Sequence, residues 1–191
     1  MTAPHIPPGV DFGPLLGLIG TWTGDKGIDV APQPDGSEDI PYHETITFDP
    51  VGDVTNAKKQ LLAVVSYHQV VRRKSNDEVF HDELGYWMWD AQSQTIMQSL
   101  IVPRAVALLA GGTYTGPVDP AADITLHVAA RLNDPDWSIA QSPFMRDNAS
   151  TVEFRHRITF NATHLSYAET TVLDIYNRTF DHTDNNELTR T

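Results

Sequence analysis

The feature that most restricts the fold of this chain is a period-two alternation of apolar and polar residues in its second half. Residues 124–132 alternate Ile, Leu, Val, Ala and Leu with Thr, His, Ala and Arg, and residues 152–160 repeat the pattern with Val, Phe, His, Ile and Phe. Successive side chains of a strand point to opposite faces of a sheet. Each segment therefore predicts a β-strand with one buried face.

Segments of strand length recur between turn-forming sequences from Gly20 onward, and no long amphipathic helices alternate with them. A parallel α/β sheet is therefore disfavoured, and closing the sheet would remove its unpaired edges. We predict an all-β fold, a closed antiparallel β-barrel of about ten strands, as one domain over residues 1–191. Residues 1–10 are expected to be extended, and Asp11 to cap a two-turn helix that ends near Ile19. Residues 103–110 are apolar on both faces and are taken as strand, although their periodicity also permits a helix.

Composition excludes several kinds of protein. The 191 residues are 40% hydrophobic and 20% charged, which suits one folded core. There is no cysteine, so disulfides and thiolate sites are excluded. The net charge of −12 disfavours nucleic acid and anionic membrane surfaces as partners. No apolar stretch reaches the roughly 18 to 20 residues of a membrane span, and the N-terminal sequence does not resemble a secretion signal, so a cytoplasmic location is expected.

Common catalytic motifs are missing from the sequence. It contains no phosphate-binding glycine loop and no nucleophile elbow, and its eight histidines form neither H-x-H nor H-E-x-x-H. The sequence therefore contains no local motif for a metal site built from several histidines. Haem needs less from the protein, because the porphyrin supplies four nitrogens and a single histidine can complete the binding of iron.

Three clusters are candidates for a site or for packing. Trp22 lies between glycines at the start of the first expected strand, where its indole is expected to plug one end of a barrel. In residues 80–90, His81, Glu83 and Gly85 share a strand face with two tryptophans, which fits either a core strand or the wall of a ligand site. His182, near the C-terminus, could be a surface residue or a ligand.

Taken in order, these pieces resemble the nitrobindin family, which is also described as fatty-acid-binding-protein-like, lipocalin-like haem barrels. The resemblance runs from about Leu15 to Arg190. Its carriers are the Leu-Leu-Gly-x-x-Gly-Thr-Trp-x-Gly start, the Tyr-His-Glu-Thr-Ile-Thr-Phe run from Tyr42, the His-Asp-Glu-Leu-Gly-Tyr-Trp run from His81, and a C-terminal histidine.

The resemblance implies a ten-stranded barrel that holds haem b, with His182 as the proximal ligand of ferric iron and His81 on the distal side. Members of the family bind nitric oxide reversibly and some isomerise peroxynitrite, so the resemblance offers the activity of a haem-dependent peroxynitrite isomerase. In this chain the segment that follows His182 is polar, Thr183 to Asn186, where the family has an apolar residue.

Two other functions remain open from the sequence. The same barrel could carry a fatty acid or another hydrophobic small molecule without haem, with a buried Arg or Tyr meeting its carboxylate. An enzyme could instead use His81 and Glu83 as acid and base. His156 lies on the apolar face of its segment and is predicted to be structural. The oligomeric state is left open, with a homodimer among the alternatives.

Overall fold

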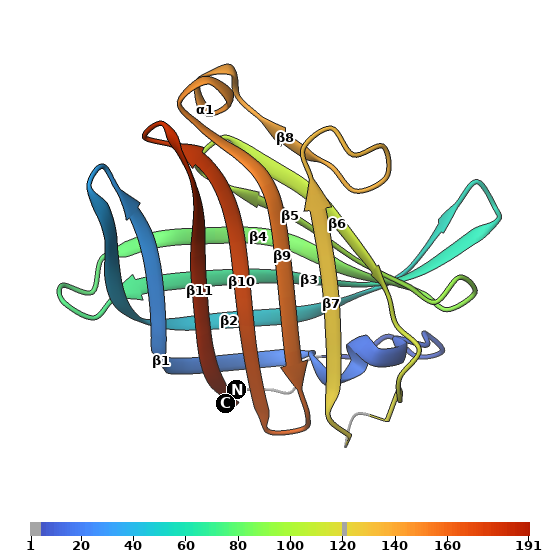
Figure 1. Cartoon of the computed structure of the whole chain (residues 1–191). Coiled ribbons are helices and arrows are strands. Elements are labelled where there is room, and N and C mark those ends of the chain that lie inside the picture. Colours follow the sequence, from blue (N-terminus) through green and yellow to red (C-terminus); the bar gives the residue numbers. More distant parts are fainter. Residues whose placement is uncertain (1–4, 120–121) are drawn as a thin grey trace.

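The computed structural model describes residues 5–119 and 122–191 and shows a closed antiparallel barrel (Figure 1). Its elements in chain order are η1 (Gly13–Gly17), β1 (Gly20–Gln33), β2 (Gly36–Asn56), β3 (Gln60–Arg73), β4 (Val79–Asp90), β5 (Thr95–Val102), β6 (Val106–Thr113), β7 (Ile124–Arg131), β8 (Ile139–Gln141), α1 (Pro143–Asn148), β9 (Ala149–Phe160), β10 (His164–Ile175) and β11 (Arg178–Arg190). The predicted all-β class is thereby confirmed.

Closure comes from β5, which pairs with β4 on one side and with β6 on the other. The ring runs β5-β4-β3-β2-β1-β11-β10-β9-β7-β6, so ten strands close the barrel, and the three-residue β8 pairs with β6 outside the ring. The expectation of about ten strands is confirmed. The apolar stretch at 103–110 divides, because a turn with Ala105 at φ 58° joins β5 to β6, and the residues from Val106 onward are strand as predicted.

The helix near the N-terminus is shorter than predicted. It is the five-residue 3₁₀ segment η1, in which the amides of Leu15 and Leu18 bond to carbonyls three residues earlier, and Asp11 accepts from the Gly13 amide at 2.9 Å. Gly13 has φ +51°, and a Cβ there would lie 2.4 Å from the Trp89 indole nitrogen. This close approach holds η1 against the barrel. Of the predicted extended segment 1–10, residues 1–4 lie outside the described residues.

One end of the barrel is filled by packed side chains. Trp22 is fully buried there and donates its indole N–H to the Leu18 carbonyl at 2.8 Å. The Arg190 guanidinium lies 4.1 Å from the indole ring and bonds to the Gly17 and Ile19 carbonyls, so η1, β1 and β11 are joined at this end. The expectation that Trp22 plugs one end is consistent with this packing, and the space for a ligand is left at the other end.

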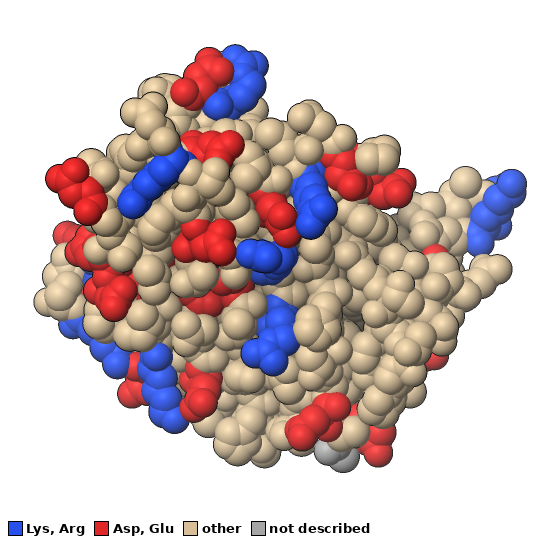
Figure 2. Space-filling view, in the orientation of Figure 1, with Lys and Arg blue, Asp and Glu red and all other residues tan. Residues whose placement is uncertain are grey.

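The outer surface is mixed in charge. On the face in Figure 2, Asp and Glu side chains lie beside Lys and Arg, and this face shows no continuous basic surface. Within the residues that the structure describes, no helix is long and apolar enough to cross a membrane.

Candidate functional site

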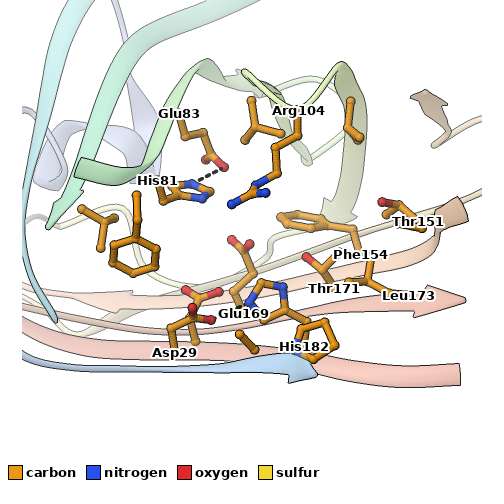
Figure 3. Close-up of a pocket in the computed structure, with 18 of the residues that line it drawn as sticks. Asp29, His81, Glu83, Arg104, Thr151, Phe154, Glu169, Thr171, Leu173 and His182 are labelled. Atoms are coloured by element: carbon orange, nitrogen blue, oxygen red, sulfur yellow. Dashed lines mark hydrogen bonds and ion pairs between the residues drawn. The ribbon is translucent and has the colours of Figure 1, made fainter. Parts of the chain in front are cut away.

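A cavity of about 350 Å³ lies inside the barrel (Figure 3), and Trp22 is not among the residues that line it. Its wall has two kinds of surface. One part is apolar and is formed by Leu100, Val102, Val106, Leu108, Phe154 and Leu173. The other is polar and acidic and is formed by Asp29, His81, Glu83, Glu169, His182 and Asp184. The cavity can therefore take a molecule with a large apolar surface and a polar or charged part.

The alternation of side chains along β11 places His182 in this wall. His182, Asp184, Asn186 and Leu188 alternate along β11, and Asn186 and Leu188 are 3% and 1% exposed. The polar run after His182 is thus not a loop. It continues the strand, and its inward residue Asn186 donates a hydrogen bond to the buried Glu44. The side chain of His182 is 32% exposed, and its Nε2 lies 2.5 Å from Oδ1 of Asp29, whose side chain is 8% exposed.

His81 lies in the same cavity on β4, with Nε2 3.5 Å from Oε2 of Glu83. Burial lowers the pKa of His81, but hydrogen bonding to Glu83 and its charge act the other way and leave the pKa above its ordinary value. Glu83 is 2% exposed, and its Oε1 accepts a hydrogen bond of 2.5 Å from the Tyr67 hydroxyl. The two histidines singled out from the sequence therefore line one cavity.

Gly85 explains how Tyr67 reaches Glu83. A Cβ at Gly85 would lie 2.7 Å from the ring of Tyr67 and 2.0 Å from the Ser99 carbonyl oxygen. The glycine therefore leaves room for a large neighbour. That neighbour is the tyrosine that holds Glu83 beside His81.

His156 is buried behind the cavity and is absent from its lining. Its Nδ1 lies 2.9 Å from Oε1 of Gln98, and its ring packs edge-on against Trp87 and Tyr167. Burial lowers its pKa to about 4, so the ring is neutral near pH 7. This environment agrees with a structural histidine, and its lack of a role as ligand remains a prediction.

Three acidic residues of the wall were not predicted from the sequence. Asp29 and Asp184 are paired residues of β1 and β11, and Asp184 also pairs with Glu169 of β10, so the three lie on adjacent strands. Burial raises the pKa of Glu169 well above its ordinary value, and it also raises that of Asp184 against the opposing effect of His81 and His182. Side chains two residues apart on a strand point to the same face, so the sequence alone could have placed Asp184 on the same face as His182. That Asp29 and Glu169 lie beside Asp184 follows only from the pairing of β1 and β10 with β11 in the closed barrel.

A further acid, Glu44, lies in a buried network next to the cavity. It is 3% exposed and accepts hydrogen bonds from Gln69 Nε2 at 2.6 Å, Tyr167 OH at 3.0 Å and Asn186 Nδ2 at 2.8 Å. Burial raises its pKa to about 7, although these three donors oppose the rise. The run from Tyr42 thus contributes a hydrogen-bonded support under the cavity, because Gln69 and Tyr167 line it.

A closed antiparallel barrel whose cavity is partly apolar and partly polar fits a ligand-binding role. The chain belongs to the family described as THAP4-like, heme-binding beta-barrel domain, whose model matches residues 11–190. Among solved structures it is similar to the crystal structure of Rv2717c from M. tuberculosis, with a TM-score of 0.71 and 20% identity over 98% of this chain and 99% of that chain. This likeness concerns the fold. No curated protein matches the chain.

Proposed function

We propose that the cavity binds haem b in its ferric form, with His182 as the axial ligand. The observation that carries the proposal is the environment of the His182 ring. One ring nitrogen, Nε2, is held by the buried carboxylate of Asp29, and the other, Nδ1, has no hydrogen-bond partner among the described residues. A metal-bound histidine commonly gives one nitrogen to the metal and the other to a carboxylate that orients the ring. Ligation through Nε2 instead requires the ring to turn away from Asp29.

The rest of the cavity also suits a porphyrin. The apolar part of the wall would contact its ring, and Arg73 and Arg104, which line the cavity, form no ion pair with any described residue and would meet its propionates. Among the described residues no group of three or more His, Cys, Asp or Glu side chains could hold a metal ion. The proposal therefore depends on the porphyrin to supply the remaining ligands to iron.

Bound haem would supply an iron position for a diatomic molecule, and nitric oxide binding or peroxynitrite isomerisation are the reactions that the family resemblance offers. The residues of this chain would orient the ligand and restrict water. Of the two described histidines in the cavity wall, His182 contacts Asp29 and His81 does not. Glu83 fixes the ring of His81. We assign His81 to contact with the bound gas. A cytoplasmic location and a homodimer stay predictions.

A fatty-acid carrier is the alternative from the sequence, and the cavity favours it less. A carboxylate head would enter a space that already holds Asp29, Glu83, Glu169 and Asp184. Like charges in a buried site repel strongly, so the head would have to remain at the arginines instead of in the interior.

Haemin titration of His182→Ala tests the ligand assignment. The variant should fold, lose or shift the haem absorption band of the wild type, and recover part of it when imidazole is added, because imidazole fills the vacated position. His68→Ala is the matched control, since His68 is half exposed and pairs with Asp82 at 3.2 Å. His81→Ala should keep the band and change nitric oxide affinity. A His182→Ala protein with the wild-type spectrum would show that iron is bound elsewhere.

A further inference from the structure

The side of the cavity that holds His182 has an excess of acidic groups. Asp29, Glu169 and Asp184 lie on three adjacent strands, paired through Asp184 in the register. Figure 3 shows the Glu169 carboxylate extended into the cavity, between the His182 side and the His81 side. The three carboxylates therefore face the volume that a ligand of His182 would occupy.

These carboxylates have few partners in the protein. The Glu169 side chain is 12% exposed and accepts no hydrogen bond within the described chain, and the nearest basic nitrogen is Nδ1 of His156 at 3.7 Å. That nitrogen already lies 2.9 Å from Gln98 Oε1. The Asp184 side chain has no hydrogen bond or ion pair with any described residue, and Asp29 has His182. A buried carboxylate without a partner is costly, and a cation that enters the cavity removes that cost.

The opposite wall specifies the rest of the ligand. Leu100, Val102, Leu108 and Phe154 present apolar surface across the cavity, so a small hydrated cation would leave that surface without contact. A ligand that satisfies both walls is a largely apolar molecule with a positive charge held close to His182.

We propose that Asp29, Glu169 and Asp184 select the ligand by charge and favour an apolar molecule with a positive centre beside His182. This inference rests on the proposed function and adds a specificity to it. A ferric porphyrin core carries a net positive charge, whereas a ferrous core carries none. The three carboxylates therefore stabilise ferric haem relative to ferrous haem, and they prefer porphyrins of trivalent metals to those of divalent metals.

Two non-reacting porphyrins separate charge from shape. Gallium(III) protoporphyrin IX has a positive core and zinc(II) protoporphyrin IX a neutral one, while the ring and the propionates are the same. The wild type should bind the gallium compound at least about tenfold more tightly, the effect of one favourable charge contact in a partly buried site. Glu169→Gln and Asp184→Asn should each remove most of this preference by weakening gallium binding, with zinc binding unchanged within about twofold.

The control is Glu187→Gln, which makes the same chemical change on β11 at an exposed side chain that pairs with Lys26. It should keep the wild-type preference. In iron-loaded protein, Glu169→Gln and Asp184→Asn should also raise the midpoint potential, which reports charge without any catalytic assay. Circular dichroism will establish that each variant is folded.

The outcomes distinguish this inference from the proposed function. Equal binding of both porphyrins by the wild type, or a midpoint potential that neither variant changes, overturns the charge selection while haem binding stands. Absence of saturable binding of haemin and of both porphyrins overturns the proposed function, and this inference with it.

Discussion

Ionisation of the buried Glu44 should control how the stability of the protein depends on pH. Its pKa rises from an ordinary value of 4.5 to about 7 because burial removes water from the carboxylate. A folded-state pKa above the unfolded value means that the folded protein binds the proton more tightly. Its contribution is therefore complete below pH 4.5 and is lost as pH rises through about 7. A shift of this size corresponds to about 3 kcal/mol.

Urea unfolding of the unliganded protein at pH 5 and pH 8 measures this loss. Glu44 should lower the free energy of unfolding of the wild type by about 2.5 kcal/mol over this range, and Glu169 and Asp184, whose pKa values are also raised, act in the same direction. His156, whose pKa burial lowers to about 4, acts in the opposite direction. In Glu44→Gln the free energy of unfolding at pH 8, relative to that at pH 5, should be about 2.5 kcal/mol higher than in the wild type, because an amide does not titrate. Glu38→Gln, at an exposed side chain, should keep the wild-type dependence. A Glu44→Gln protein whose stability depends on pH as the wild type's does would refute the reasoning.

Three further substitutions test the packing. Trp22→Ala should lower the free energy of unfolding by about 3 to 5 kcal/mol, measured by urea unfolding, because a fully buried indole and its bond to Leu18 are lost. Gly27→Ala should cost about 1 to 3 kcal/mol, since a Cβ there would lie 2.1 Å from the ring of Tyr42, and an unchanged stability would contradict that packing. His156→Leu should remain folded and keep the haem band, and loss of the band would identify His156 instead of His182 as the ligand.

The sequence predicted the strands because their alternation records which side of each strand is buried. Residues 124–131 form β7 as predicted, and β9 carries the predicted apolar face from Phe154 to Phe160. The start of β9 differs from the prediction. A register shift opposite Val172 and Leu173 turns Thr151 into the cavity wall in place of Val152. Alternation cannot report such a bulge, because one extra residue exchanges the faces without changing the composition of the segment.

Short elements and contacts between distant strands were harder to predict. Helix α1 was missed, although Ser142 caps it and Pro143 begins it, because six residues give no helical period. The histidines were found from the family resemblance. The acidic wall was not, because Asp29 is more than one hundred residues from Glu169 and only the closed register makes them neighbours.

Iron anomalous diffraction from crystals of the protein loaded with haemin tests the haem assignment most directly. We expect one strong iron peak inside the barrel, within bonding distance of a ring nitrogen of His182. A peak bonded to another side chain, or iron found only on the outer surface, would contradict it.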